Sequence, residues 1–168
     1  MNKYTLIKSK IVSGIDFMRL LSIYRFKNQK IVFTNGCFDL IHLGHVKYLT
    51  RAADLGDILI IGLNSDSSVI KIKGHGRPVL DQESRALTLA AFSFVNNIVL
   101  FDEETPYKLI KQIRPDILVK GGDYNPEEIV GYDIVKDNGG EVKMLDFIKG
   151  YSTSNIIKGI ASQIHPEK

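Results

Sequence analysis

The chain has 168 residues, a formal net charge of +3, 44% hydrophobic residues and 24% charged residues. This length is typical of one domain, and this composition excludes an intrinsically disordered chain. The longest uninterrupted apolar run, 58–63, is far shorter than the roughly 20 residues that a membrane span needs, so we expect no membrane association. Lysine and arginine do not cluster as they do in nucleic-acid-binding proteins, and we expect no nucleic-acid partner.

The first residues and the cysteine content bear on the cellular compartment. The segment from Met1 to Leu6 lacks the apolar core of a secretory signal peptide. Cys37 is the single cysteine of the chain, so it forms no internal disulfide, as is common in a reducing cytoplasm. These two observations predict a cytoplasmic protein.

Short β-rich runs alternate with segments of helical periodicity along the whole chain. The predicted helices cover 11–27, 43–55, 81–92, 106–114, 126–136 and 152–164. The predicted strands cover 30–34, 57–63, 97–101, 117–120 and 141–145. This alternation predicts the α/β fold class: a Rossmann-like parallel sheet of about five strands with helices on both faces. We expect one domain over 1–168, with a helical extension at 1–27 and a catalytic core at 28–160.

In such sheets the ligand lies beyond the carboxyl ends of the strands, so the residues after each strand are the first place to look for chemistry. The segment 34–45 follows the first strand and contains neither the dinucleotide fingerprint nor a Walker A loop. It does contain His42 and His45, which share a helix face, with Gly44 between them. A helix N-terminus offers free N–H groups and a positive dipole end, and Gly44 lets a phosphate approach the backbone.

Two other functions of this segment are weaker. A zinc site requires three or four protein ligands, and the remaining histidines lie in different segments, so we expect no metal held by the protein. Cys37 has no activating base beside it in the sequence, and a small buried residue in a tight turn is the simpler interpretation.

Three later segments each allow a structural and a functional interpretation. Lys71 and Lys73 lie in a Gly-rich polar stretch, which is either a solvated loop or a mobile cationic arm that closes over phosphates. The segment 120–123 is either an ordinary turn or a place where two glycines let the backbone run close to a flat base. The hydroxyl groups of Ser152 and Thr153 either cap the last helix or bind triphosphate oxygens.

The segment 36–45 resembles the signature of the cytidylyltransferase-like nucleotidyltransferases, which carry an H-x-G-H motif. The resemblance continues over about 28–160. It includes Asn64-Ser65-Asp66, Lys71-Ile72-Lys73-Gly74, Arg77-Pro78-Val79, Glu83-Ser84-Arg85, Lys120-Gly121-Gly122-Asp123-Tyr124 and Ser152-Thr153-Ser154-Asn155-Ile156-Ile157. The H-x-G-H motif specifies only the superfamily. The last two segments are similar to those of the bacterial heptose 1-phosphate adenylyltransferases, which make ADP-activated heptose for lipopolysaccharide.

The resemblance implies transfer of AMP from ATP to a sugar 1-phosphate, with D-glycero-β-D-manno-heptose 1-phosphate as the expected acceptor. It implies catalytic roles for His42, His45 and Lys73, of which Lys73 is preferred over Lys71 as the catalytic lysine. The expected nucleotide-binding residues are Asn35, Gly36, Cys37, Phe38, Gly44, Lys120, Gly121, Asp123, Ser152 and Thr153. The expected sugar-phosphate-binding residues are Asp39, Lys71 and Arg77. Glu83 and Arg85 are expected to form a structural ion network near the site.

The resemblance also has implications for cofactors and partners. We expect Mg²⁺ to arrive bound to the nucleotide, because the sequence offers no dedicated carboxylate cage. The chain is too short to include the sugar kinase domain of fused heptose enzymes, which predicts a separate kinase partner, and a homodimer through the N-terminal helix is a further expectation.

One departure from the related glycerol-phosphate enzymes keeps two alternatives open. Phe147 stands where those enzymes have an arginine, with Lys149 as a substitute cation, and this makes a cytidine-specific enzyme less favoured. The alternatives are a cytidylyltransferase acting on glycerol 3-phosphate or a phosphoamino alcohol, and a nucleotide-binding regulator without catalysis.

Overall fold

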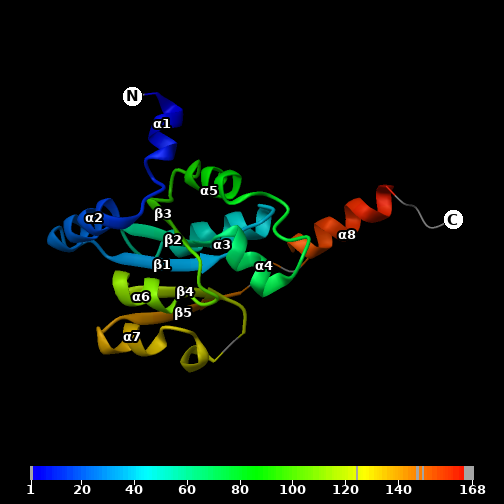
Figure 1. The fold of residues 1–168 in the computed structure, drawn as a ribbon. Helices are drawn as coiled ribbons and strands as arrows, with labels where there is room; N and C mark the ends of the chain where they lie inside the picture. The colour runs from blue at the N-terminus through cyan, green and yellow to red at the C-terminus, as the bar shows by residue number, and fades with distance from the viewer. Residues whose placement is uncertain (1, 124, 147, 149, 165–168) are drawn as a thin grey trace.

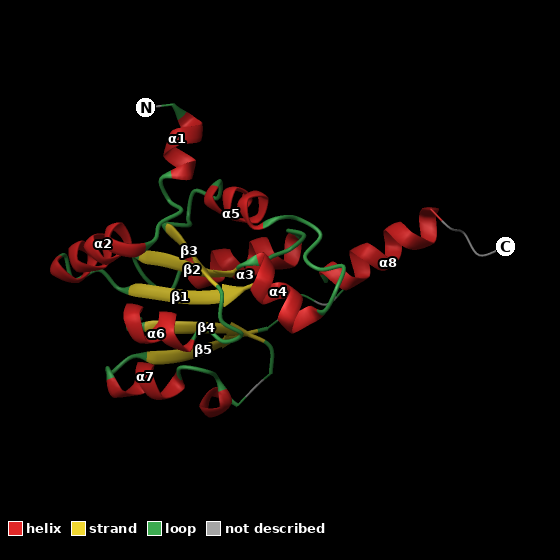
Figure 2. Ribbon diagram, viewed as in Figure 1, coloured by secondary structure: helices red, strands yellow, loops and turns green. Residues whose placement is uncertain are grey.

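The computed structural model describes residues 2–123, 125–146, 148 and 150–164. Its centre is one sheet of five parallel strands in the order β3-β2-β1-β4-β5 (Figure 2). The strands are β1 (Ile31–Gly36), β2 (Ile58–Asn64), β3 (Asn97–Phe101), β4 (Ile117–Gly121) and β5 (Glu141–Leu145). The predicted Rossmann-like sheet is confirmed, and each predicted strand matches an observed one to within two residues at either end.

Helices cover both faces of this sheet (Figure 1). They are α1 (Lys3–Lys8), α2 (Gly14–Phe26), α3 (Leu43–Ala53), α4 (Asp66–Lys73), α5 (Gln82–Ala90), α6 (Tyr107–Ile113), α7 (Tyr132–Asp137) and α8 (Thr153–Ile164), with a 3₁₀ turn at Pro126–Glu128. Side chains of α2, α6 and α7 belong to one hydrophobic cluster, and those of α3 and α5 belong to the other. The last helix, α8, extends away from the body of the protein.

The strand sequences explain the two clusters. Successive side chains of a strand point to opposite faces, and β1 sends Ile31 and Phe33 into one cluster and Val32 into the other. All seven residues of β2 are buried, which is why this strand is a nearly continuous apolar run rather than an alternating one. The predicted burial of both faces is therefore confirmed.

Three helix predictions differ from the structure. The helix predicted at 126–136 is a 3₁₀ turn followed by α7, because Gly131, with a φ of 90°, interrupts the segment. The helix predicted at 11–27 begins only at Gly14, because Lys10 and Val12 bond to the backbone of Ile98 in the edge strand β3, and the short α1 before them was not predicted. The stretch with Lys71 and Lys73 is not a loop, because both lysines lie in the last turn of α4. The serine-rich start of that helix has a capping function, since Ser65 Oγ accepts the Ser68 N–H at 3.2 Å.

The strand order creates a crevice at one edge of the sheet. The chain leaves β1 toward β2 on one side and later returns to β4 on the other side, so the carboxyl end of β1 is the topological switch point. β1 pairs with β2 over its whole length, but with β4 only at Val32 and Phe33. Beyond Phe33 the two strands separate, which opens space for a ligand. Across the described residues, we find no helix long and apolar enough to span a membrane.

Candidate functional site

A cavity of about 640 Å³ lies beyond the carboxyl ends of β1 and β4. The following residues expected at the site line it: Asn35, Gly36, Cys37, Phe38, Asp39, His42, Gly44, His45, Lys73, Lys120, Gly121, Ser152 and Thr153. Four segments that are distant in the sequence thus meet in one place: the loop after β1, the end of α4, the end of β4 and the start of α8.

The two histidines form the start of α3. His42 is the N-cap, and its Nδ1 accepts the backbone N–H of His45 at 3.4 Å. The imidazole rings stack with their centroids 3.9 Å apart and an angle of 18° between their planes. Because Nδ1 of His42 is an acceptor in the neutral ring, the proton of that ring is on Nε2 and is available for donation to a ligand.

Burial keeps both rings neutral. It lowers the pKa of His42, and it lowers the pKa of His45 to about 4, with further contributions from the charges of His42 and Lys73. A backbone contact with Leu40 partly offsets this lowering, although Nδ1 of His45, which is buried, makes no hydrogen bond of standard geometry among the described residues. Because Nδ1 is shielded from solvent, a ligand would act on this ring through its protonation or its other nitrogen and not through a contact at Nδ1.

Gly44 is required by the stacked pair. A Cβ atom at this position would lie 3.0 Å from the His42 ring and 3.2 Å from Cβ of Tyr151. Phe38 supports the other side, where its ring meets the His45 ring edge-on with centroids 5.4 Å apart. The ring positions are therefore fixed by their neighbours before any ligand binds.

Two side-chain bridges connect β1 and β4 where their backbones separate. The hydroxyl of Tyr48, from α3, lies 2.7 Å from Thr34 Oγ1 and donates to the Val119 carbonyl at 3.2 Å. One residue further along each strand, Lys120 Nζ donates to Asn35 Oδ1. Burial raises the pKa of Tyr48 to about 12 and lowers the pKa of Lys120 to about 8. These bridges form the floor of the crevice.

Lys73 approaches the histidines from α4. Its charge contributes to the lowered pKa of His45, and it lines the same cavity, yet no ion pair or hydrogen bond of its side chain occurs within the described part of the chain. The cation is therefore available for an anionic ligand. Lys71, two residues earlier, is exposed and does not line the cavity.

Asp39 is the anchor of the segment that follows α4. Its buried carboxylate accepts hydrogen bonds from Arg77 Nε at 2.8 Å, the Val79 N–H at 2.9 Å and the Leu80 N–H at 3.0 Å. These donors hold the pKa of Asp39 low in spite of its burial. The carboxylate and Arg77 are thus engaged with each other, and Arg77 is not among the residues that line the cavity.

The start of α8 forms the wall opposite the histidines. Ser152 Oγ accepts the Asn155 N–H at 3.1 Å and caps the helix, so the structural interpretation of this serine is correct. Ser152, Thr153 and Ser154 also line the cavity, which places the free N–H groups of the helix start beside it. The capping and ligand-binding interpretations are compatible.

The remaining predicted residues differ in where they lie relative to the cavity. Asp123 is exposed and is not part of the cavity lining. Tyr124, Phe147 and Lys149 lie outside the described residues, so the structure does not address the departure at position 147. Cys37 lines the cavity, but burial raises the pKa of its thiol, which is unfavourable for a nucleophile. In the described ranges no group of three or more histidine, cysteine, aspartate or glutamate side chains is arranged to hold a metal ion.

The sequence analysis did not identify four residues of the cavity lining. These are Tyr48, Ile148, Tyr151 and Ser154. Tyr48 lies three residues after His45, on the same face of α3, and this spacing was the available signal. Tyr151 and Ile148 precede α8 in an irregular segment, where neither helical nor strand periodicity indicates which side chains face inward.

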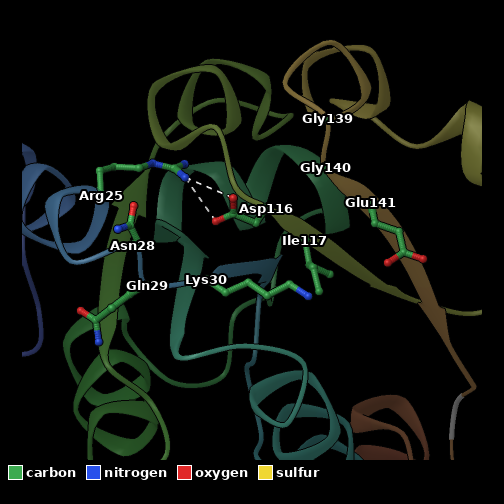
Figure 3. Close-up of a pocket in the computed structure, with 9 residues that line it drawn as sticks. All are labelled: Arg25, Asn28, Gln29, Lys30, Asp116, Ile117, Gly139, Gly140 and Glu141. Carbon is green, nitrogen blue, oxygen red and sulfur yellow. Dashed lines mark hydrogen bonds and ion pairs between the residues drawn. The ribbon is translucent and has the colours of Figure 1, made fainter.

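A second hollow, of about 500 Å³, lies at the opposite edge of the sheet, beside the amino ends of β1, β4 and β5 (Figure 3). Arg25 lines this hollow and donates to the Asp116 carboxylate, and it also donates to the carbonyls of Ile113 and Arg114, which are not among the lining residues. Asp116 in turn accepts the Ile31 N–H at 2.8 Å. Arg25 and Asp116 are thus paired with each other, whereas the exposed side chain of Lys30, which also lines the hollow, makes no hydrogen bond or ion pair among the described residues.

Comparison with known proteins identifies the family of the chain. The profile of the family described as Cytidylyltransferase-like matches residues 33–159. The bifunctional protein HldE of Syntrophotalea carbinolica is 53% identical over 152 residues, which are 90% of this chain and 31% of that protein. HldE of Wolinella succinogenes is 51% identical over 153 residues, which are 91% of this chain and 31% of that protein. The chain thus spans about a third of the length of these relatives.

Among solved structures, a lipopolysaccharide core biosynthesis protein from Thermoplasma volcanium is similar with a TM-score of 0.58 and 27% identity. The match covers 74% of this chain and 99% of that one. The family profile includes β1, the histidine pair, α4, β4 and most of α8, which are the elements that form the cavity. The chain therefore belongs to the cytidylyltransferase-like family.

Proposed function

We propose that the protein transfers AMP from ATP to a sugar 1-phosphate, with D-glycero-β-D-manno-heptose 1-phosphate as the acceptor, and releases pyrophosphate. The observation that carries this proposal is the cavity itself, where the neutral His42–His45 stack, the start of α8 and Lys73, a cation with no ion-pair partner among the described residues, face one space. Relatives that are bifunctional HldE proteins and a similar lipopolysaccharide core biosynthesis protein support a sugar nucleotide as the product.

The reaction requires no covalent intermediate. An oxygen of the sugar phosphate attacks the α-phosphorus of ATP, a new P–O bond forms, and the bond from the α-phosphorus to the oxygen that bridges to the β-phosphorus breaks. The electron pair leaves with pyrophosphate. Catalysis of such a displacement consists of positioning the two substrates and stabilising the charge that develops on the leaving oxygen.

The chain's own side chains provide the groups for this task. Nε2–H of His42 donates to a phosphate oxygen, and His45 stabilises the bridging oxygen as its charge increases. Lys73 neutralises the transition state from the end of α4. Ser152, Thr153 and the first N–H groups of α8 bind the β- and γ-phosphates. Mg²⁺ bound to the nucleotide would supply further neutralisation of phosphate charge.

The remaining predicted residues keep supporting roles in the proposal. Asn35, Gly36 and Gly121 line the opening between β1 and β4, which suits a flat base, with Lys120 at its floor. Because the Asp39 carboxylate is engaged by three donors, we assign it the role of holding Arg77 and its segment rather than direct contact with the sugar phosphate. Lys71, Arg77 and Asp123 stay predictions as ligand contacts.

The reaction implies a partner and a location. A kinase that forms the sugar 1-phosphate must precede this enzyme, and we propose that it is a separate protein. Because the relatives are bifunctional, a kinase on the same polypeptide is the alternative, and the mass of the protein purified from its own cells distinguishes the two. A cytoplasmic homodimer that binds neither membrane nor nucleic acid completes the proposal.

The experiment that tests the function is a matrix of nucleotides and acceptors with pyrophosphate release as the readout. ATP and CTP are each combined with heptose 1-phosphate, other sugar 1-phosphates and glycerol 3-phosphate. We expect ATP to be used at least about ten times better than CTP with the heptose phosphate, a gap of about 1.4 kcal/mol in transition-state binding. Preference for CTP with glycerol 3-phosphate would support the cytidylyltransferase alternative, and ATP binding without turnover would support a regulator.

A further inference from the structure

Arg85 is the fourth residue of α5, and its side chain is fully buried, with 0% exposed. Its three donor groups reach three different segments. Nε donates to the Leu80 carbonyl at 3.1 Å, Nη1 to the Cys37 carbonyl at 2.5 Å, and Nη2 to the Asp66 carboxylate at 2.7 Å. Burial of an arginine is costly unless all of its donors are satisfied, so these contacts indicate a specific structural task.

The three segments are the parts that surround Lys73. Asp66 is the first residue of α4, and Lys73 is the last. Asp66 is also fixed to the start of α5, because its N–H donates to Gln82 Oε1 and its carboxylate accepts the Gln82 N–H, each at 3.1 Å. The amino end of the helix that carries Lys73 is therefore tied to the same helix that carries Arg85.

The chain that follows Lys73 is tied to the histidine loop. Leu80 donates its N–H to Asp39 and offers its carbonyl to Arg85. Cys37, whose carbonyl accepts from Arg85, lies two residues before Asp39 in the loop between β1 and the histidine pair. One guanidinium thus connects the loop that leads to His42 with both the start and the continuation of α4.

The Lys73 side chain makes no hydrogen bond or ion pair within the described residues. Its location relative to His45 depends on the backbone of α4, and the backbone of α4 depends on the anchors at its two sides. We infer that Arg85 is a positioning residue, which sets the distance between Lys73 and the histidine pair by joining the loop after β1 to α4. This inference rests on the role of Lys73 in the proposed function.

A double-mutant cycle tests the inference, with kcat and the KM for ATP measured by pyrophosphate release. The four proteins are the wild type, R85K, K73A and the double variant. R85K keeps the charge but loses the planar fork that serves three acceptors, so we expect kcat to fall about 10- to 100-fold while the KM for ATP changes little. In the K73A background, R85K is expected to change kcat less than about twofold, because two groups that act as one unit are not additive.

A matched control comes from the opposite edge of the sheet. Arg25 also donates to one carboxylate, that of Asp116 (Figure 3), and to two backbone carbonyls, those of Ile113 and Arg114. We expect R25K to lower the melting temperature and leave kcat unchanged. If R85K does not fold, D66N takes its place in the cycle, because it retains an acceptor for Arg85 while removing the charge and the bond from Gln82 N–H.

The outcomes separate the inference from the proposed function. Wild-type kcat in K73A would refute the role of Lys73 in the proposed function and the inference with it. A loss of kcat in K73A, combined with an equal further loss from R85K in both backgrounds, would overturn the inference alone. A fall of kcat in R25K as large as that in R85K would also overturn it, since the effect would then follow from stability.

Discussion

The two edges of the sheet carry similar charged groups, but these groups differ in whether they have hydrogen-bond partners within the chain. At the amino edge, Arg25 and Asp116 are paired with each other and with backbone groups (Figure 3). At the carboxyl edge, within the described residues, Lys73 makes no side-chain hydrogen bond or ion pair, and the buried Nδ1 of His45 makes no hydrogen bond of standard geometry. Both edges contain a cavity of several hundred cubic ångströms, so cavity volume does not distinguish them.

The difference lies in whether the central cluster of each edge is satisfied within the chain: the Arg25–Asp116 cluster is, although the exposed Lys30 beside it has no side-chain partner among the described residues. A structural cluster completes its own hydrogen bonds, and its energy is realised on folding. A binding cluster leaves donors and rings unpaired, and the ligand completes them. Perturbed histidine and lysine pKa values occur at the carboxyl edge, as is typical of functional sites. The predictions below test this contrast.

The largest effect is expected at His45. H45A removes one group that stabilises developing charge, which is worth about 3–4 kcal/mol, so kcat should fall roughly 10²–10³-fold. Far-UV circular dichroism and pyrophosphate release measure fold and turnover on the same sample. A folded H45A protein with turnover close to that of the wild type would remove the histidine pair from the mechanism.

The next largest effect concerns the pH dependence of stability. The pKa of His45 is about 4 in the folded protein, and an unperturbed histidine has a pKa near 6.5. Between these values the unfolded chain binds a proton that the folded protein does not, so the free energy of unfolding rises with pH in this window. Acidification from pH 6.5 to pH 4 should therefore lower the free energy of unfolding through this residue, by at most about 3 kcal/mol and by less where solvent screens the partly exposed ring.

The variant H45N isolates this contribution. Urea unfolding at several pH values should give a shallower rise of stability between pH 4 and pH 6.5 in H45N than in the wild type. Above pH 7 the two curves should run parallel, because His45 is neutral in both states there. Equal slopes in the acidic window would show that the ring is not kept neutral by its burial.

The sequence predicts the sheet and the histidine pair because both depend on local patterns. β2 is an apolar run bounded by polar residues, and His42, Gly44 and His45 are adjacent in the chain. The sequence does not predict α4, because the serine and aspartate residues at its start are typical both of turns and of helix N-caps. The hydrogen bond from Arg85 to Asp66 that fixes this start joins residues 19 positions apart, so no local pattern reveals it.

The floor of the crevice could not be predicted for a different reason. Tyr48 bridges Thr34 and Val119, which are far apart in the sequence and meet only because β4 lies beside β1. No periodicity of one segment reveals a contact that depends on the order of strands. The same holds for Lys120 and Asn35, each of which was expected at the site without its partner being known.

Removal of the Tyr48 hydroxyl is expected to have an intermediate effect. Y48F leaves the Val119 carbonyl and the Thr34 hydroxyl without this partner, which should lower the free energy of unfolding by about 1–2 kcal/mol. The KM for ATP should rise, because the bridge sets the width of the crevice.

Y24F is the matched control. Tyr24 donates to Asn97 at 2.7 Å, away from the cavity, so this variant should lose similar stability with no change in KM. A KM increase of equal size in both variants would contradict a specific role of Tyr48.

The smallest effect is expected at the amino edge, where D116N removes the charge that faces Arg25. The two side chains are 40% and 41% exposed, so solvent screens their attraction, and a loss of about 1 kcal/mol in the free energy of unfolding is the expected result. Oδ2 of Asp116 also accepts the Ile31 N–H at the start of β1, so this side chain helps to hold the end of the strand. Turnover should not change, because the contact lies at the edge of the sheet opposite the histidines. Urea unfolding and pyrophosphate release on the same preparation test both parts. A fall in kcat with stability unchanged would mean that a change at the amino edge alters catalysis at the carboxyl edge. The satisfaction of hydrogen bonds within a cluster would then no longer distinguish structural from functional residues in this protein.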